Sequence, residues 1–515
     1  MVQRIGVSFT SILSRLFNRL GRRCRKHRFF PTPSSSLSIA PDLYSTKEIQ
    51  KLAKRFSGKL LLRQEIPLDE KTFQKLLSHG YFTAYPGIQQ GFIIQRCLRC
   101  NNEDPQLLRP FPCASCKKEH VYCRKCIMMG RVSLCEKLYV WSGPSYPWPK
   151  LPNSCLWQGK LRPLQEAGAK KVLEAVRRKE RLLVWAVTGA GKTEILFPAI
   201  EKALEKGERI CLASPRVDVV RELFPRFKSA FPNVEIEALY GGSEHLGGTS
   251  QIIIATTHQL LRFRSAFDLM IVDEIDAFPY HCDPMLPFVT ERARKQRSAV
   301  IYLTATPRDS FKREIIQKRL PYCFIPLRYH GYPLPVPRLI ADTRLNHSIS
   351  SFVLSRKVIH WLTHRIQPRR QLLLFVPTIS IAEGIVEAFA SCLYKEKLIE
   401  AKEEVTFVHA EDIHREEKIE AFRRQHLYAL VTTTILERGV TFPSVDVAVL
   451  QADHDIFDRS ALVQIAGRAG RNRRDPKGEV VFFYQVKTEA IVGAVDEIKQ
   501  MNRQGRKWKE APLNR

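Results

Sequence analysis

The sequence predicts an α/β protein in which two tandem parallel-sheet domains follow a small cysteine-rich module. Three features predict it: two series of short, wholly apolar runs that alternate with helical stretches, a proline-rich stretch between the series, and cysteines gathered in one segment. Continuous apolar runs are typical of strands buried on both faces, as in parallel sheets flanked by helices. With 515 residues, the chain is long enough for about three domains.

The domain boundaries follow from where these features change. The first apolar series runs from residue 182 to 303 and the second from 372 to 483, with the proline-rich stretch at 327–337 between them. We expect residues 44–91 to be mostly helical and irregular, and residues 139–149 to be an aromatic, proline-rich connector. The expected parts are a basic N-terminal extension (1–40), an N-terminal segment (41–155) with the cysteine module at about 95–136, and two α/β domains (156–335 and 336–515).

Charge indicates the class of partner. The chain has 82 Lys and Arg against 52 Asp and Glu, a formal net charge of +30. Such an excess favours a polyanion, with nucleic acid ahead of an anionic membrane surface, although a merely soluble basic protein is the alternative. No apolar run approaches the ~18 residues that would span a bilayer, so we expect no transmembrane segment.

The first 32 residues hold eight Arg and Lys and no acidic residue. Their apolar residues are spaced for one helical face, but the apolar core of a secretory signal is missing. We expect a basic tail, with a membrane-surface helix or a transit-like peptide as alternatives.

A phosphate-binding loop is predicted directly after the first apolar run. Residues 186–193 read Ala-Val-Thr-Gly-Ala-Gly-Lys-Thr, which departs from the usual pattern only in having Ala186 at the first glycine position. The glycines let backbone N–H groups surround phosphates, the lysine reaches the β- and γ-phosphates, and the threonine hydroxyl can bind Mg²⁺. The residues expected to hold ATP and Mg²⁺ are Thr188, Gly189, Ala190, Gly191, Lys192 and Thr193.

Two acidic residues complete the predicted nucleotide chemistry. Asp273 follows the apolar run 269–272 and is placed to bind Mg²⁺, and Glu274 beside it can polarise the attacking water. The alternative is a charged helix start, because acidic residues cap helix N-termini well.

With both motifs placed, the chain resembles the DExD/H-box helicases of superfamily 2, whose core is two RecA-like domains. Residues 304–306 (Thr-Ala-Thr) resemble the motif that couples nucleotide state to domain closure in that family. Residues 464–471 resemble the family's last motif, which implies a catalytic role for Gln464 and a role as arginine fingers for Arg468 and Arg471. A guanidinium is always charged and can stabilise the charge that builds on phosphate oxygens in the transition state.

Further motifs resemble the nucleic-acid contacts of the same helicases. They are residues 214–216, 240–242 and 256–259 in the first domain and 432–441 in the second, rich in hydroxyls and glycines that approach phosphates without reading bases. Gln165, upstream of the phosphate loop, is placed to sense adenine, with an ordinary helix-surface glutamine as the alternative.

Four segments narrow the resemblance: 123–131, 184–194, 273–280 and 432–441 are similar to the ComFA family of late-competence ATPases, relatives of the replication-restart helicase PriA. The similarity covers about residues 81–500. It implies a cytoplasmic ATPase, or one at the inner face of the membrane, driven by single-stranded DNA during uptake of transforming DNA. Implied partners are the ComFC protein, the ComEC-type channel and the recombination mediator DprA.

Three C-x2-C pairs lie within 30 residues, and clustered pairs of this kind indicate metal ligands rather than disulfides. The family's four-cysteine pattern matches the outer pairs, which implies that Cys97, Cys100, Cys123 and Cys126 bind a structural Zn²⁺. The alternatives are the pair Cys113 and Cys116 with the third pair, a two-metal cluster of six thiolates, or substitution by Cys135. Basic residues around the pairs would suit DNA phosphates, or be simply solvated: Arg96, Arg99, Lys117, Lys118, Arg124 and Lys125.

The function expected is an ATP-driven motor on single-stranded DNA that acts in DNA uptake. One rival is another motor task, at stalled replication forks or on RNA. A second rival is a zinc-dependent nucleic-acid-binding adaptor whose nucleotide site only switches conformation.

Overall fold

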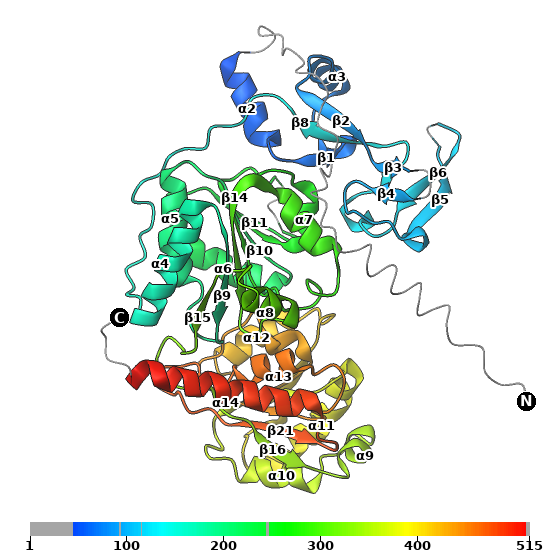
Figure 1. Ribbon diagram of the computed structural model, residues 1–515. Coiled ribbons are helices and arrows are strands. Elements are labelled where there is room, and N and C mark those ends of the chain that lie inside the picture. The colour runs from blue at the N-terminus through cyan, green and yellow to red at the C-terminus, as the bar shows by residue number, and fades with distance from the viewer. Residues whose placement is uncertain (1–44, 92–93, 115, 244–246, 511–515) are drawn as a thin grey trace, which may run out of the picture.

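The structure, a computed structural model, describes residues 45–510 except 92–93, 115 and 244–246. The predicted basic extension lies outside the described residues. The first α/β domain lies between an N-terminal part and the second α/β domain (Figure 1). In the described ranges no helix combines the length and the apolarity that crossing a membrane would need.

The first α/β domain contains a seven-stranded sheet, and every neighbouring pair of its strands is parallel. The strand order is β11-β12-β10-β13-β14-β9-β15. Strands β10, β12 and β13 are almost wholly buried, as their apolar sequences predict. Its strands are β9 (Arg181–Ala186), β10 (Ile210–Ser214), β11 (Ile236–Leu239), β12 (Ile252–Thr256), β13 (Phe267–Val272), β14 (Arg294–Thr304) and β15 (Tyr322–Ile325), and its helices are α4 (Pro163–Arg178), α5 (Phe197–Glu205), α6 (Val217–Ala230), α7 (Met285–Ala293) and α8 (Asp309–Ile316).

The second α/β domain repeats this architecture with six parallel strands in the order β16-β21-β20-β17-β19-β18. The predicted fold class, two RecA-like parallel-sheet domains behind a cysteine module, is therefore confirmed. Its strands are β16 (Arg338–Ala341), β17 (Gln371–Phe375), β18 (Val405–Val408), β19 (Ala429–Thr432), β20 (Val445–Val449) and β21 (Val480–Tyr484), and its helices are α9 (Leu345–Ser350), α10 (Arg356–Thr363), α11 (Ile379–Lys395), α12 (Arg415–Arg423), α13 (Arg459–Ala466) and α14 (Glu489–Glu510).

The N-terminal part is helical and irregular over most of residues 45–91, as predicted, but it also contains short strands that were not predicted. Two helices, α2 (Thr46–Phe56) and α3 (Glu70–Ser78), pack on a three-stranded sheet of β1 (Leu60–Leu62), β2 (Phe82–Pro86) and β8 (Lys137–Trp141). Strand β8 overlaps the start of the stretch 139–149 that was predicted as a connector, and it is central in the sheet. Local periodicity could not reveal these strands, since they are three to five residues long and pair across the whole cysteine module.

The cysteine module is built from short antiparallel strands. Strands β3 (Ile88–Gln90) and β4 (Gln95–Cys97) form one pair, and β5 (Leu108–Pro112), β6 (Glu119–Cys123) and β7 (Val132–Ser133) form a small sheet. Arg292 of α7 fixes the module to the first α/β domain, because its buried guanidinium donates to the carbonyls of Leu98 and Arg99 as well as to Leu261. Burial lowers the pKa of Arg292 to about 9.

Candidate nucleotide site and cysteine centre

The phosphate loop connects β9 to a short helical turn before α5, as a phosphate-binding loop must. Gly189 and Gly191 both have φ +75°, a left-handed conformation that glycine adopts without strain. A side chain at Gly191 would also collide with the Gln165 amide. The departure from the usual pattern at Ala186 is accommodated because this residue is the last, fully buried position of β9.

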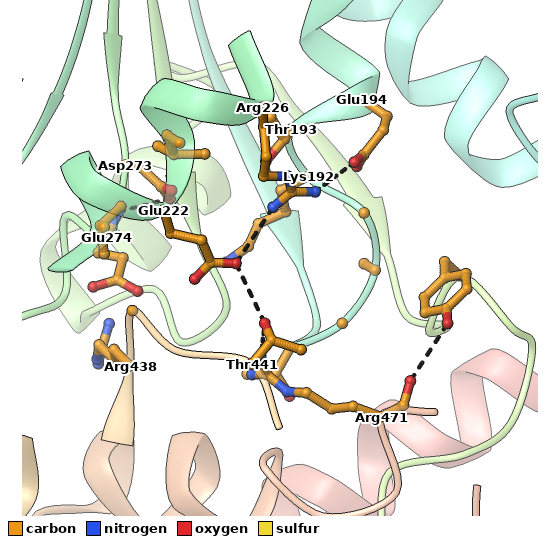
Figure 2. A pocket seen from close by; sticks show the side chains of 18 of the residues that line it. Lys192, Thr193, Glu194, Glu222, Arg226, Asp273, Glu274, Arg438, Thr441 and Arg471 are labelled. Atoms are coloured by element: carbon orange, nitrogen blue, oxygen red, sulfur yellow. Dashed lines mark hydrogen bonds and ion pairs between the residues drawn. The ribbon is translucent and has the colours of Figure 1, made fainter. Parts of the chain in front are cut away.

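A cavity of about 480 Å³ opens at this loop and is lined by both α/β domains. Arg438, Gly439 and Thr441 reach it from the second domain, opposite Lys192 and Asp273 of the first (Figure 2). The structure thus brings together every residue predicted for the nucleotide site, although the role of each stays a prediction. The predicted residues that line the cavity are Gln165, Thr188, Gly189, Ala190, Gly191, Lys192, Thr193, Asp273, Glu274, Gln464, Arg468 and Arg471.

The two neighbouring acids lie at the carboxyl end of β13. The backbone N–H of Glu274 donates to Asp273 Oδ1 at 2.8 Å, and Glu274 itself has a left-handed backbone, with φ +54°. Burial raises the pKa of Asp273, and it raises the pKa of Glu274 to about 7 against the opposing effect of Arg438. A carboxyl group with such a pKa can exchange protons near neutral pH, which suits a group that orients or deprotonates water.

Asp276 lies two residues after Glu274 and was missed by the sequence prediction. It connects its own segment to the motifs 304–306 and 432–441. Its carboxylate accepts hydrogen bonds from Thr304 Oγ1 and Thr306 Oγ1, both at 2.6 Å, and pairs with Arg438 of the second domain at 2.7 Å. Burial works to raise the pKa of Asp276, but Arg438 and the two hydroxyls hold it well below its usual value. The spacing Asp-Glu-x-Asp within 273–276 was the signal for a second functional acid.

Further ion pairs and hydrogen bonds hold the two domains together around the cavity. Arg328, in the linker after β15, donates to the carbonyls of Gly470 at 2.6 Å and Gly467 at 3.3 Å. Thr306 Oγ1 lies 2.6 Å from Ser460 Oγ across the same interface. The domains are therefore in contact on several sides of the cavity in this structure. Ion pairs that cross the interface are Arg216 with Glu437 (2.5 Å), Arg308 with Asp458 (3.0 Å), Arg415 with Asp218, and Arg221 with Glu416.

The two predicted arginine fingers have different surroundings. The guanidinium of Arg468 is buried and donates to the backbone carbonyls of Glu437 and Val440 in its own domain. Arg471 is partly exposed, and its guanidinium makes only a 3.0 Å bond to Gly467 O and a long 3.4 Å bond to Thr441 Oγ1 (Figure 2). Arg471 is thus the freer of the two to turn towards a phosphate.

Gln165 is buried and does not lie on a helix surface. Its side-chain amide donates to Ala190 O at 2.8 Å, and its carbonyl oxygen accepts from Arg162 N at 2.9 Å. It therefore connects the start of α4 to the phosphate loop. Its role towards adenine stays a prediction.

Several residues that line the cavity lie outside the motifs recognised in the sequence, or pair in ways that the motifs do not predict. Glu222 and Arg226 of α6 interact with Thr441 and Glu194 respectively (Figure 2). Trp157 and Tyr329 also border the cavity. Arg438 lies inside the predicted motif 432–441, but its pairing with Asp276 needs the folded interface. The others belong to helix surfaces and loops without a recognisable spacing.

Buried polar atoms around the cavity fit a charged ligand. Within the described residues, Thr188 Oγ1, Glu274 Oε2, Arg438 Nη1 and Arg468 Nη2 are buried but have no hydrogen-bonding partner. Such atoms are costly unless a ligand or water satisfies them. Acceptors near the acids and donors near the arginines match a triphosphate with a divalent cation.

The three first-domain motifs predicted to contact nucleic acid lie along one edge of the first sheet. They follow β10, β11 and β12, which are neighbours in the order β11-β12-β10, so the motifs emerge side by side at the carboxyl ends of the strands. A side chain added at Gly241 or Gly242 would meet none of the described residues within 4 Å, so this edge is open at that point. Arg216 is an exception, because it pairs with Glu437 across the domain interface.

The four outer cysteines form one buried cluster whose Sγ atoms all lie within 4.8 Å of one another. Cys97 and Cys126 are 3.8 Å apart, and Cys100 and Cys123 are 3.5 Å apart. A tetrahedral zinc ion with Zn–S bonds of about 2.3 Å separates its sulfurs by about 3.8 Å, so the cluster fits Zn²⁺. The structure thus groups the cysteines as predicted, and zinc as their ligand remains a prediction.

The basic residues around this cluster are not all available to DNA. Arg99 is fully buried and pairs with Glu65 at 2.9 Å, which contradicts its predicted place on a phosphate-binding face. Arg96 pairs with Glu103, and Lys125 pairs with Asp283 of the first α/β domain. Lys117, Lys118 and Arg124 are exposed.

The chain matches known family models and related proteins over most of its length. Residues 45–140 match the family model of the competence protein ComFA N-terminal domain, residues 158–309 match that of the type III restriction enzyme res subunit, and residues 355–473 match the helicase conserved C-terminal domain. The competence protein ComFA of Bacillus subtilis (strain 168) is 42% identical over 458 residues, which are 89% of this chain and 96% of that protein. The chain belongs to the ComFA family.

A second ComFA protein, from Streptococcus pneumoniae (strain ATCC BAA-255 / R6), is 39% identical over 383 residues, 74% of this chain and 86% of that protein. Among solved structures, S. cerevisiae Dbp5 bound to RNA and ADP BeF3 is 17% identical, with a TM-score of 0.46 over 68% of this chain and 95% of that one. This ComFA-family chain is a competence-related, helicase-like protein and a helicase-type ATP-dependent enzyme. Its helicase domains imply ATP with Mg²⁺ and a nucleic-acid partner.

Proposed function

We propose that this ComFA-family protein is an ATP-driven motor that moves along single-stranded DNA during uptake of transforming DNA. The observation that carries the proposal is the cavity between the two parallel-sheet domains, which has the phosphate loop on one side and Arg438, Arg468 and Arg471 on the other. A triphosphate placed there contacts both domains, so its cleavage changes the free energy of domain closure.

Each residue has a role in this proposal. Backbone N–H groups of the phosphate loop and the Lys192 side chain bind the phosphates. Thr193 and Asp273 would hold Mg²⁺, which neutralises phosphate charge when bound. Glu274 orients the attacking water. Arg471 stabilises the transition-state charge from the second domain, and Arg468, bound to its own domain's carbonyls, fixes the motif that carries it. Gln165 positions the adenine base, and Gln464 positions the groups around the attacking water.

Asp276 connects ATP hydrolysis to the opening and closing of the two domains. Its contacts with Thr304, Thr306 and Arg438 join the first domain's strand ends to the second domain. Opening of the cavity breaks the Arg438 contact, and closing restores it. Because the nucleic-acid motifs follow β10, β11 and β12 on the same sheet, each cycle shifts them relative to residues 432–441.

The direct experiment is ATP turnover by the intact protein with and without single-stranded DNA, for the wild type and for Lys192→Ala. We expect turnover that single-stranded DNA stimulates and that Lys192→Ala abolishes. Stimulation by RNA alone would replace the DNA-uptake role with RNA remodelling, and stimulation by forked duplex alone would favour a replication-restart role. DNA uptake in cells that survives Lys192→Ala would favour an adaptor.

The cellular setting is part of the proposal. We propose action at the cytoplasmic face of the membrane together with the ComFC, DprA and ComEC-type partners that family membership implies. Capture of these three proteins by the tagged chain, in competent cells and after mild crosslinking, tests it, and their absence from the captured material would contradict it.

A further inference from the structure

Three more cysteines meet outside the four-cysteine cluster. The Sγ atoms of Cys113, Cys116 and Cys135 lie within 4.8 Å of one another, and Cys113 and Cys135 are 3.7 Å apart. Nε2 of His120 lies 2.8 Å from Cys116 Sγ. The Cys113–Cys135 separation is far from the ~2.05 Å of a disulfide but close to the ~3.8 Å between two sulfurs on one zinc ion.

The backbone around the middle pair repeats that of the first pair. In the first pair, Asn101 N donates to Cys97 O at 2.8 Å and Cys97 N donates to Asn102 O at 3.0 Å. In the middle pair, the equivalent bonds run from Lys117 N to Cys113 O at 2.9 Å and from Cys113 N to Lys118 O at 3.0 Å.

The residue after each pair confirms the match between the two turns. Asn101 has φ +62° and Lys117 has φ +54°, so both turns close through a left-handed residue. A left-handed backbone at a lysine is strained and persists where its surroundings fix the turn. The two C-x2-C turns are therefore the same structural unit, one inside the four-thiol cluster and one outside it.

Strand β6 brings the other two groups to the middle pair. Cys113, Cys116, Lys117 and Lys118 lie between β5 and β6, so His120 near the start of β6 lies beside this turn, while Cys123 at the end of β6 belongs to the four-thiol cluster. Strand β7 pairs with the end of β6, and Cys135 follows β7. Ser133 Oγ lies 3.3 Å from Cys135 Sγ and can donate to a thiolate there.

Few side chains of this small sheet are buried. Of the residues in β5, β6 and β7, only Leu108, Cys123, Val132 and Ser133 are buried. A segment with so few buried apolar side chains generally needs a disulfide or a metal to fold, and a thiolate-bound ion supplies much of that free energy.

We propose that Cys113, Cys116, His120 and Cys135 bind a second Zn²⁺ ion, separate from the ion proposed for the outer cysteines. The spacing C-x2-C-x3-H-x14-C gives three thiolates and one imidazole, a closed ligand set of the structural kind. The ion fixes the β5–β6 turn to the end of β7 and so fixes the position of the exposed Lys117 and Lys118. This inference does not depend on the proposed motor function.

The first test is the zinc content of the intact wild-type protein, purified under reducing conditions, together with zinc X-ray absorption. We expect two zinc ions per chain, and ligands that total seven sulfurs and one nitrogen. One ion per chain, or a spectrum of sulfur alone, would overturn the proposal.

The second test is the double variant Cys113→Ser/Cys135→Ser, with Cys282→Ser as the control because Cys282 is an exposed free cysteine outside the module. We expect one zinc ion in the double variant and two in the control. Two ions in the double variant would mean that these cysteines are not ligands.

The third test keeps the fold intact and examines the histidine. His120→Ala should lose one of its two ions to a chelator faster than the wild type, and His120→Cys should restore retention because a fourth thiolate replaces the imidazole. Equal retention in the wild type and in His120→Ala would remove His120 from the site.

Discussion

At the residue scale, the protonation of the Glu274 carboxyl group gives the sharpest test of the proposed reaction. Its carboxyl group lies in the cavity with one oxygen unpaired among the described residues, and burial raises its pKa to about 7. A group that must be ionised to orient water then loses its function as the pH falls through that value.

The pH dependence of ATP turnover follows from this pKa. Because kcat/KM reports the free enzyme, kcat/KM for ATP should fall about tenfold per pH unit below pH 7 and level off above it. Glu274→Gln should lower kcat about 10²- to 10⁴-fold and remove this acidic limb. A wild-type profile that stays level down to pH 5.5 would contradict the role of Glu274.

At the element scale, helix α13 and the loop after it approach the phosphate loop very closely. A Cβ atom at Gly467, directly after α13, would overlap the Thr188 hydroxyl of the phosphate loop. At another point of the domain interface, a Cβ atom at Gly439 would lie 2.7 Å from Asp218 Cβ of α6. Glycine is required at these positions because the two domains touch there, and contact is needed only when the cavity is closed.

Gly467→Ala should therefore block closure while both domains stay folded. We expect kcat to fall about 10²-fold, since displacing a catalytic group by about 1 Å has that effect, with little change in thermal stability. Gly247→Ala is the matched control, because its new Cβ would meet ordinary contacts at 3.5 Å or more. Equal turnover in the two variants would mean that closure at Gly467 is not required.

Elements of the two α/β domains were predictable where their strands are buried and apolar, as in β10, β12 and β13. Edge strands such as β15 and β16 were not, because each is only four residues long, and so short an apolar run cannot be told from part of a helix. The small sheet of β1, β2 and β8 was missed for a different reason: its pairing joins residues far apart in the sequence, which no local pattern encodes.

The residues of the candidate site were predictable where each lies within one short, continuous sequence motif. Lys192, Asp273 and Arg471 each lie in a short segment whose residue types serve one chemical task, and the structure brings them to one cavity. The Asp276–Arg438 pair was not predicted, and Cys113, Cys116 and Cys135 were considered only as alternatives to the outer pairs, because each set joins segments that only the fold places together.

At the scale of the whole molecule, the net charge of +30 and the edge formed by the ends of β10, β11 and β12 predict how the proposed DNA strand would bind. Contacts to phosphates release counterions, so affinity for single strands should fall with salt with a log–log slope of about −0.7 per contacted phosphate. Affinity should depend little on base sequence.

A charge placed on this edge tests its position. A Cβ at Gly241 has no described neighbour within 4 Å, so we expect Gly241→Asp to be accommodated and to add a carboxylate beside the expected phosphates. It should weaken single-strand binding about fivefold in a fluorescence titration, the effect of about 1 kcal/mol of repulsion, while Gly241→Ala should bind as the wild type does. Equal weakening in both variants would indicate a structural effect.

The central claim is that ATP hydrolysis needs groups from both domains, and the most direct measurement is the turnover of Arg471→Ala in the presence of single-stranded DNA. The control is Arg473→Ala, an exposed arginine two residues further along. We predict that Arg471→Ala lowers kcat about 10³- to 10⁵-fold, with much less effect on the KM for ATP, and that Arg473→Ala does not. A kcat for Arg471→Ala equal to that of its control would contradict the account.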